Sequence, residues 1–557
     1  MAVTDLSSGD LTPALDAVQG AEDAGSIDLR AAVTSLGRAA LGSGRLIRSG
    51  AGFGVEAAKA LAGRSDLAPA KGDRRFADPT WVDHPGYRRV KQVYLAFSKA
   101  MDDLVSDADL EWRSKERARF AAGILTSSLA PTNTLIGNPA AIKRAMETAG
   151  GSLGTGTRHF VDDLLHNGGM PRQVDASNLI VGQNMAVTPG AVVRRTEVME
   201  LIQYTPTTPQ VHAKPLVIVP PEINKYYFLD LAPGRSLVEF ALSQGLQVFI
   251  ISWRNPHVEH AGWDLDTYAG AVVTAIDTAR EISGSDDVVT LGMCAGGITM
   301  ATVLSYLAAT GSEKVAAAGF GVTLIDWNIP SPVGAFQSGR LLNVARRKSR
   351  SAGVLDARSL GSVFTWMRPN DLVWNYWVNN YLMGRKPPAF DILAWNADKT
   401  NLPSALHQQF LDMFERNRLV QPGGLTVLGE PFDMSSIKMD TYVVGGLSDH
   451  LTPWQGCYRA TQLVGGHSTF VLSPTGHIQT PVSPPSPKAY HFTGPQPGAD
   501  PEAWRAQATR QEGTWWNHWA EWTTSRAGDL LGAPETLGSA AHPPLVAAPG
   551  TYVFEGP

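Results

Sequence analysis

The chain has 557 residues, of which 43% are hydrophobic and 18% charged, and its formal net charge is −5. This composition is typical of a globular protein rather than a disordered one, and the small negative charge provides no general attraction to nucleic acid. The two cysteines, Cys294 and Cys457, lie too far apart for a metal-binding motif, so we expect free thiols in a cytoplasmic protein.

The first third of the chain is predicted to be mobile and then helical. Residues 1–75 are rich in alanine, glycine and serine and are predicted to be a flexible segment. Its first residues, Met1–Pro13, are acidic and polar, unlike a signal peptide. Residues 76–185 show apolar positions at helical spacing and are predicted to form an α-helical domain. No apolar run approaches about 18 residues, so we expect no transmembrane helix.

From about residue 186 onward, short apolar runs rich in β-branched residues alternate with helical patterns. The runs are Pro215–Pro220, Gln247–Trp253, Val288–Leu291, Gly319–Ile325, Tyr442–Gly445 and Phe470–Leu472. This alternation predicts a mostly parallel sheet covered by helices, that is, an α/β catalytic domain over 186–557. The alternation gives way to aromatic-rich, helical sequence at about 326–429, which we interpret as a cap insertion over the active site.

The pentapeptide Gly292–Gly296 follows the third of these runs directly and is itself followed by a helical pattern. A strand, a sharp Gly-x-nucleophile-x-Gly turn and a helix form the nucleophile elbow of the α/β-hydrolase fold. Here Cys294 stands where most such enzymes carry serine, which points towards acyl groups held as thioesters. The alternative is that Cys294 is a buried, unreactive residue of the core.

A cysteine nucleophile needs a histidine as base and an acid that orients the histidine. In this fold the acid follows the nucleophile along the chain, and the histidine follows the acid. Asp449 ends the strand pattern that begins at Tyr442, and His477 ends the one that begins at Phe470. Asp449 could instead cap the helix that begins near Thr452, and His477 could be a loop residue without a chemical role. His450 competes as the base but lacks a strand-end loop of its own.

Backbone amides must stabilise the oxyanion of an acyl-transfer intermediate. The amide of Ala295, after the nucleophile, is one predicted donor, and the loop after the Val217–Val219 strand, near Ile223, supplies the other. We expect His450 and Trp395 to join Ile223 and Ala295 around the substrate pocket. Cys457 is predicted to pack inside a helix.

Several longer segments around these residues resemble the polyhydroxyalkanoate synthases. The matching segments are Pro220–Tyr227, Ser252–Pro256, Gly292–Gly297, Met367–Tyr381, Phe390–Asn396, Asp449–Trp454 and Ser473–Ile478. The resemblance begins near residue 80 and extends to the C-terminus. It is greatest to the single-subunit type associated with medium-chain monomers, as in Glu200–Tyr204 and Ala548–Val553. The chain departs from the family pattern at Glu222, where Trp or Gln is expected, and at Met293 and Ala295.

The resemblance implies an α/β-hydrolase fold and an acyltransferase that polymerises (R)-3-hydroxyacyl-CoA with release of CoA. It implies that Cys294 carries the acyl chain as a thioester, that His477 is the base, and that Asp449 orients His477 and helps to activate the incoming 3-hydroxyl. No cofactor or metal is expected, because CoA arrives with the substrate. The implied partners are the growing polyester, the surface of polymer granules in the cytoplasm and a second copy of the chain.

Two other functions are alternatives to polymer synthesis. A cysteine-dependent thioesterase or intracellular polyester depolymerase would need the same triad. A granule-associated scaffold without activity would need none of it, and an intact triad argues against that alternative.

Overall fold

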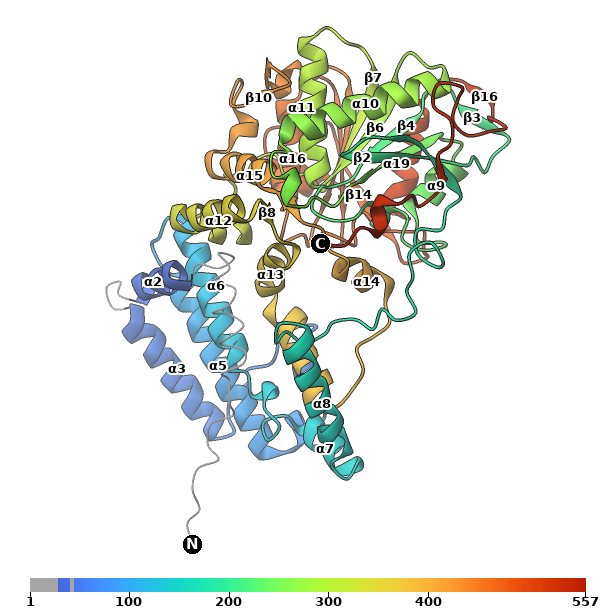
Figure 1. Cartoon of the computed structure of the whole chain (residues 1–557). Coiled ribbons are helices and arrows are strands. Elements are labelled where there is room, and N and C mark those ends of the chain that lie inside the picture. The colour runs from blue at the N-terminus through green and yellow to red at the C-terminus, as the bar shows by residue number, and fades with distance from the viewer. Residues whose placement is uncertain (1–28, 41–44) are drawn as a thin grey trace. The chain divides into compact units, whose positions relative to one another are not determined.

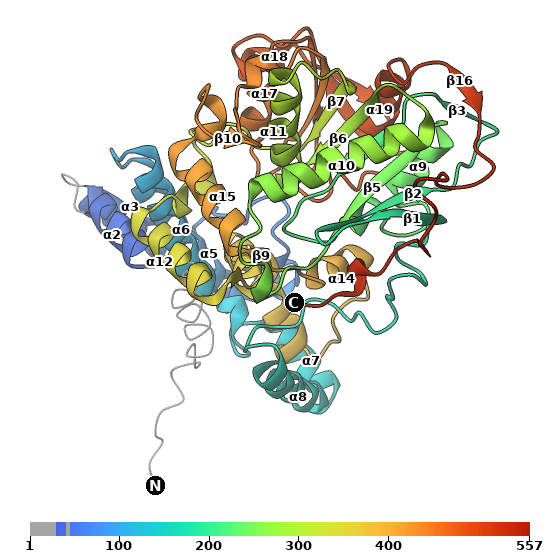
Figure 2. The same cartoon turned by 45° about the horizontal axis from the view of Figure 1, so that its top comes forward.

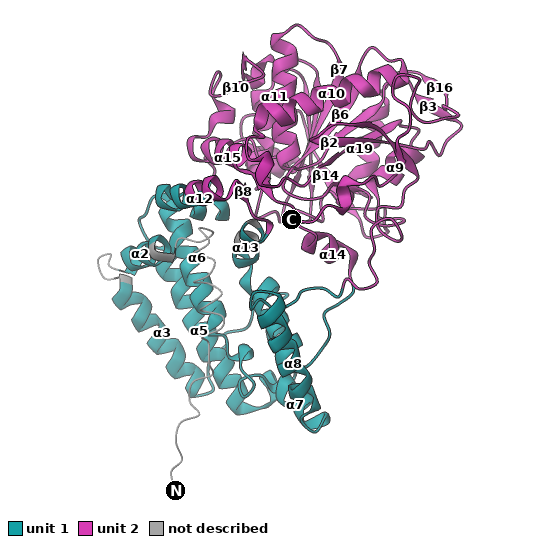
Figure 3. Ribbon diagram, in the orientation of Figure 1, with its two compact units in different colours: residues 1–175, 330–345, 358–389 teal, residues 176–329, 346–357, 390–557 magenta. Residues whose placement is uncertain are grey.

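The computed structural model describes residues 29–40 and 45–557. Two compact units divide the chain (Figure 3): one contains 1–175, 330–345 and 358–389, and the other contains 176–329, 346–357 and 390–557. Part of the segment 1–75 predicted to be flexible, including Met1–Pro13, lies outside the described residues. The predicted domain boundaries, with a cap at about 326–429, stay predictions.

The first unit is helical (Figure 1), which fits the predicted α-rich N-terminal region, although α2 and α3 lie within the segment 1–75 predicted to be flexible. Aromatic residues form part of its core: Trp81, which is fully buried, packs edge-on against Phe76. Its helices are α2 (Leu29–Ala40), α3 (Arg45–Leu61), α4 (Thr80–Asp83), α5 (Pro85–Ser106), α6 (Trp112–Ser128), α7 (Pro139–Glu147) and α8 (Gly151–His166). Two further helices, α12 (Gly339–Ala352) and α13 (Ala357–Met367), contain residues assigned to both units.

The second unit is built on an 11-stranded mixed sheet in the order β15-β14-β13-β12-β7-β6-β4-β5-β2-β1-β17. The six strands from β13 to β5 in this order run parallel, and antiparallel strands extend both sides. The strands are β1 (Gly190–Arg195), β2 (Met199–Tyr204), β4 (Leu216–Val219), β5 (Val248–Trp253), β6 (Val288–Met293), β7 (Val315–Gly321), β12 (Asp440–Gly446), β13 (Ser468–Ser473), β14 (Tyr490–Thr493), β15 (Thr509–Glu512) and β17 (Val546–Ala547). Six short strands form three further pairs: β3 (Gln210–His212) with β16 (Leu530–Gly532), β8 (Val354–Leu355) with β9 (Leu402–Pro403), and β10 (Thr426–Val427) with β11 (Glu430–Pro431).

This architecture confirms the α/β-hydrolase class, and five of the six predicted parallel strands lie where the apolar runs placed them. The prediction for β7 was wrong by four residues: the strand is Val315–Gly321, not Gly319–Ile325. The prediction gave weight to Val322, Leu324 and Ile325, but Val322 has a φ of 43° and turns the chain out of the strand. The alanine and glycine residues of β7 instead sit between β6 and β12, where small side chains allow close packing.

Helices cover both faces of this sheet. In Figure 2, α10 and α11 lie in front of the sheet, whereas α9 and α19 lie on the opposite face, where Phe240 of α9 packs against Trp516 of α19. The helices of the second unit are α9 (Leu237–Ser243), α10 (Leu265–Ser283), α11 (Ala295–Ala309), α14 (Asp391–Ala397), α15 (Ser404–Arg416), α16 (Trp454–Tyr458), α17 (Ala460–Leu463), α18 (Pro501–Gln507) and α19 (Trp515–Thr524). The region from β6 to α11 is therefore buried between layers, which is where the predicted nucleophile lies.

Glycine 297 gives a test of this packing. A Cβ atom added to Gly297 would lie 2.0 Å from Oγ1 of Thr323 and 2.9 Å from its Cβ. Replacing Gly297 by alanine should therefore lower the free energy of unfolding by about 1–3 kcal/mol through overpacking. Thermal or denaturant unfolding measures the change.

The matched control is Gly270→Ala in α10 of the same unit, where the added Cβ would meet only a leucine methyl at 4.0 Å. Alanine favours the helix interior over glycine, so this variant should gain about 0.5–1 kcal/mol. Equal effects of the two substitutions would contradict the packing described for α11.

Candidate active site

Cys294 lies at the turn between β6 and α11, with a φ of 51° and a ψ of −122°. A positive φ is strained for a residue with a side chain, and such strain at a strand-to-helix turn is the geometry of a nucleophile elbow. The backbone is held on both sides: the Cys294 amide donates to Gly321 O at 2.9 Å, and its carbonyl accepts from the Gly297 amide at 3.1 Å. The thiol is therefore presented on a fixed backbone, and the residue is partly exposed.

Glycine is needed on both sides of this turn for steric reasons. A Cβ on Gly292 would lie 2.6 Å from the Cα of Gly297, and one on Gly296 would lie 2.4 Å from the carbonyl oxygen of Pro220. Both contacts are with backbone atoms, which have no rotamer by which to move away. The first turn of α11 can thus pack directly against the loop that follows β4.

Asp449 and His477 lie on the loops after β12 and β13, two neighbouring parallel strands. These loops are joined by backbone hydrogen bonds from the Leu447 amide to Ser473 O (2.8 Å) and from the Ser448 amide to Thr475 O (3.1 Å). Beyond His477, the indole of Trp515 in α19 donates to Thr480 O at 2.7 Å. The two loops are therefore fixed to each other and to the sheet.

The side chains of Asp449, His477 and Cys294 act on one another. Nδ1 of His477 donates to Oδ2 of Asp449 at 2.7 Å, and the Cys294 side chain is close enough to influence the imidazole electrostatically. Burial opposes protonation of His477, but the Asp449 carboxylate and the Cys294 thiolate outweigh it and raise the pKa of the imidazole well above its usual value. Burial also disfavours the charged form of Asp449, yet His477 and hydrogen bonds from Thr452 hold the pKa of this carboxyl below its usual value. The arrangement favours the protonated form of His477.

Thr452 is a part of this cluster that the sequence analysis did not single out. Its hydroxyl donates to Oδ2 of Asp449 at 2.7 Å, and its amide donates to Oδ1 at 2.9 Å. The Leu451 amide also donates to Oδ1, at 2.8 Å. A turn of three residues after an acid was visible in the sequence, but nothing in the pattern showed that the turn wraps around the carboxylate.

The buried thiol of Cys457 is close by and differs from that of Cys294. Its Sγ donates to the carbonyl oxygen of Thr452 at 3.5 Å, within α16, as the prediction of a packed helical cysteine implies. Burial raises the pKa of Cys457 well above its usual value, and the negative charge of Asp449 adds to this shift. Cys457 is therefore a poor nucleophile.

The two predicted oxyanion donors lie on adjoining elements. Ala295 is the first residue of α11, where an amide has no partner within the helix. Ile223 follows β4 in the loop that packs against Gly296, and its side chain is partly exposed. The two residues thus lie on elements that touch each other, and their role as oxyanion donors stays a prediction.

The two other predicted pocket residues have different surroundings. His450 directly follows Asp449 and is partly buried. Trp395 of α14 is buried, its indole donates to Lys225 O at 2.8 Å, and its ring packs against Phe228 at a centroid distance of 5.1 Å. Trp395 thus supports the segment after Ile223, and its role in a substrate pocket stays a prediction.

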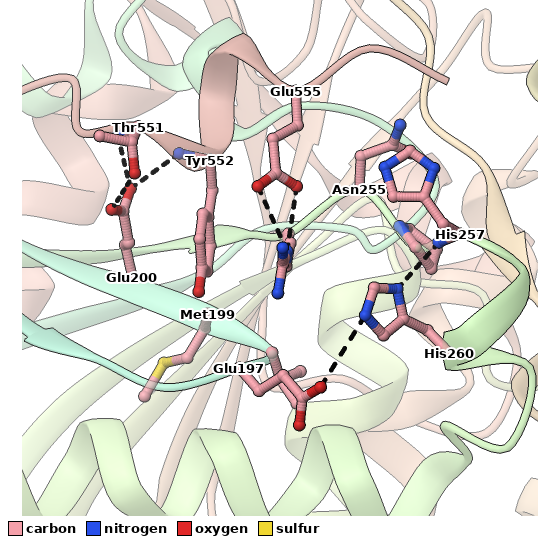
Figure 4. A network of polar contacts seen from close by, with 12 residues as sticks. Glu197, Met199, Glu200, Asn255, His257, His260, Thr551, Tyr552 and Glu555 are labelled. Atoms are coloured by element: carbon pink, nitrogen blue, oxygen red, sulfur yellow. Dashed lines mark hydrogen bonds and ion pairs between the residues drawn. The ribbon is translucent and has the colours of Figure 1, made fainter.

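The C-terminal residues are fastened to the strands beside this loop, as Figure 4 shows. Glu200 of β2 is fully buried and accepts from the amides of Thr551 (2.8 Å) and Tyr552 (3.0 Å). Glu555 pairs with Arg254 after β5 at 3.1 Å. Lys225 donates to Val553 O at 2.6 Å and pairs with Asp398 at 2.8 Å, which connects this tail to the loop after β4. The contacts made by Thr551, Val553 and Glu555 span more than 300 positions and left no signal in local sequence patterns.

Comparison with known proteins agrees with this geometry. Residues 72–241 match the family described as the N-terminus of poly-beta-hydroxybutyrate polymerase (PhaC), and residues 229–483 match the alpha/beta hydrolase fold. The chain is 47% identical over 504 residues to poly(3-hydroxyalkanoate) polymerase 1 of Ectopseudomonas oleovorans, covering 90% of each chain. It is 39% identical to the poly(3-hydroxyalkanoate) polymerase subunit PhaC of Cupriavidus necator, over 88% of this chain and 84% of that one.

Solved structures include a monoacylglycerol lipase from Paleococcus ferrophilus, which aligns with a TM-score of 0.33 and 13% identity. The alignment covers 59% of this chain and 99% of the lipase.

Asp449→Asn tests the electrostatic link between the three side chains. Without the carboxylate the pKa of His477 falls, the thiolate of Cys294 loses its imidazolium partner, and alkylation of Cys294 by iodoacetamide near pH 7 should slow by about tenfold or more. Peptide mass mapping over time measures the rate at each site.

Cys457 serves as the internal control in the same experiment. We expect it to remain unmodified in the folded protein of both forms, because it is buried and its pKa is raised. Unchanged alkylation of Cys294 in the variant, or faster labelling of Cys457 than of Cys294 in the parent protein, would contradict the described cluster.

Proposed function

This chain belongs to the poly(3-hydroxyalkanoate) polymerase family, and from that membership we propose that it polymerises (R)-3-hydroxyacyl-CoA into polyester and releases CoA. The observation that carries the proposal is a thiol, not a hydroxyl, at the strained elbow, within electrostatic reach of a histidine that is itself hydrogen-bonded to a buried aspartate. A thiolate exchanges one thioester for another at nearly balanced free energy, and the acyl-enzyme stays reactive towards an alcohol.

Acylation follows from this geometry. The Cys294 thiolate attacks the thioester carbon of the substrate, and the carbonyl oxygen becomes negative in the tetrahedral intermediate. In this proposal the backbone amides of Ala295 and Ile223 donate to this oxygen. The carbon–sulfur bond to CoA then breaks, the imidazolium of His477 gives its proton to the departing CoA sulfur, and the acyl group remains on Cys294.

Elongation uses the same groups in the second half of the reaction. His477 removes the proton from the 3-hydroxyl of an acyl unit, and the resulting oxygen attacks the carbonyl carbon of another acyl chain held as a thioester. An ester bond forms, the thioester bond breaks, and the thiolate that leaves again pairs with His477. Asp449 holds Nδ1 of His477 throughout and stabilises the imidazolium, which is the role of an acid in a triad.

We extend the proposal to the partners that the sequence analysis implied. These are the growing polyester, the surface of polymer granules in the cytoplasm and a second copy of the chain. The resemblance of Glu200–Tyr204 and Ala548–Val553 to the medium-chain type favours monomers of medium length. Within the described residues, none of the helices has the length and apolar character to cross a membrane. Light scattering before and after substrate addition tests the dimer.

The function is tested by following two products of purified protein. With (R)-3-hydroxyoctanoyl-CoA or (R)-3-hydroxybutyryl-CoA, we expect CoA release, measured by chromatography, to be matched by insoluble polyester. Free hydroxy acid without polymer would identify a thioesterase or depolymerase instead, and the absence of turnover would favour a scaffold. The ratio of the two rates gives the preferred chain length.

Cys294→Ser should abolish polymerisation, with a rate lower by about 10³-fold or more, because a neutral hydroxyl at this site lacks the paired thiolate. The matched control is Cys457→Ala, which removes the other thiol next to the same cluster and should retain polymer formation. Activity that survives in the Cys294 variant, or that is lost only in the Cys457 variant, would contradict the assignment of the nucleophile.

A further inference from the structure

Glu222 is a buried acidic residue that the proposed mechanism does not use. It lies in the loop after β4 and is only 3% exposed. Its Oε1 accepts a hydrogen bond of 2.6 Å from the hydroxyl of Thr299. Its Oε2 is buried without a hydrogen-bond partner among the residues that the structure describes. A buried carboxyl with one unsatisfied oxygen is costly, so its presence at this place needs an explanation.

The hydrogen bond between Glu222 and Thr299 joins the two elements that carry the oxyanion donors. Glu222 directly precedes Ile223, and Thr299 lies one helical turn after Ala295 on α11. The same two elements touch through backbone at Gly296, where a Cβ would lie 2.4 Å from Pro220 O. Side chain and backbone together therefore fix the distance between the loop of Ile223 and the start of α11.

The surroundings of Glu222 supply no counter-charge. Burial raises the pKa of its carboxyl to about 7, although the hydrogen bond from Thr299 acts in the opposite direction. From α10 it faces Tyr268, whose pKa is raised by burial and further by the negative charge of Glu222. From the segment before α15, the hydroxyl of Thr400 donates to the backbone carbonyl of Glu222 at 3.5 Å.

The nearest cation in the loop sequence is engaged elsewhere. Lys225, three residues further on, pairs with Asp398. No ion pair of Glu222 occurs within the described ranges, 29–40 and 45–557. An ionised Glu222 is thus an uncompensated charge in a medium of low dielectric constant.

We propose that Glu222 is a positioning residue of the oxyanion hole that works in its neutral form, and that its ionisation weakens acyl transfer as the pH rises past neutrality. The neutral carboxyl keeps the hydrogen bond to Thr299 and carries no net charge that could repel the oxyanion. The ionised one adds a buried negative charge between the two elements that carry the proposed oxyanion donors, and this charge repels the oxygen of the thioester carbonyl as it becomes negative. This inference rests on the proposed function, because it concerns the same acyl transfer.

The test compares kcat/KM for CoA release by the parent protein and by Glu222→Gln between pH 6 and 9. Glutamine keeps the shape and an acceptor for Thr299 but cannot ionise. Dividing the two values at each pH cancels the pH dependence of every other group, which both proteins share. The ratio of variant to parent should rise by about 20-fold from pH 6.5 to 8.5, as the neutral form of a group titrating near pH 7 is lost.

Thr299→Val gives an independent readout if the first variant folds poorly, which melting temperatures at pH 6.5 reveal. The hydroxyl of Thr299 stabilises the ionised carboxyl, so its removal should move the alkaline decline of the otherwise wild-type protein to higher pH. In the double variant with Glu222→Gln, no such decline should remain.

The outcomes separate this inference from the function on which it rests. A ratio that stays constant with pH, or an alkaline decline that Thr299→Val leaves in place, overturns the role of Glu222 while polymer still forms. Absence of polymer from the parent protein at every pH overturns the proposed function itself.

Discussion

The rest of the site depends on one backbone constraint, the positive φ of Cys294 between β6 and α11. This conformation costs about 1–3 kcal/mol for a residue with a side chain and persists because neighbouring contacts leave no alternative. Those contacts need glycine at 292, 296 and 297, where added Cβ atoms would meet the backbone of α11, the loop after β4 and Thr323. The same turn sets where α11 begins and therefore where the Ala295 amide points.

The second constraint is the pairing of β12 with β13 as adjacent parallel strands. Carboxyl ends of parallel strands lie at one edge of a sheet, so the loops bearing Asp449 and His477 emerge side by side. Removing one partner of a buried ion pair of this kind costs about 3–5 kcal/mol, since the other charge is left unpaired. The hydrogen bonds from Thr452 to both carboxylate oxygens of Asp449 add to the stabilisation of its charged form.

Sequence patterns were sufficient for the features that are local. The elbow, the apolar strands and the strand-end positions of Asp449 and His477 all have short-range signals of spacing and residue type. β7 was misplaced because its small residues carry a weak strand signal, although the centre of a tightly packed sheet requires them. The contacts of Thr452 with Asp449, and those of the C-terminal residues with Glu200, were missed. They arise from tertiary packing, which local periodicity does not report.

The central claim is that the polyester grows while covalently attached to Cys294. Rapid mixing of the protein with (R)-3-hydroxyoctanoyl-CoA, acid quenching within milliseconds to seconds and peptide mass spectrometry test it directly. We expect one or more hydroxyacyl units, added as a thioester, on the peptide that contains Cys294. An acyl adduct on Cys457, or turnover to polymer with Cys294 unmodified at all times, would contradict it.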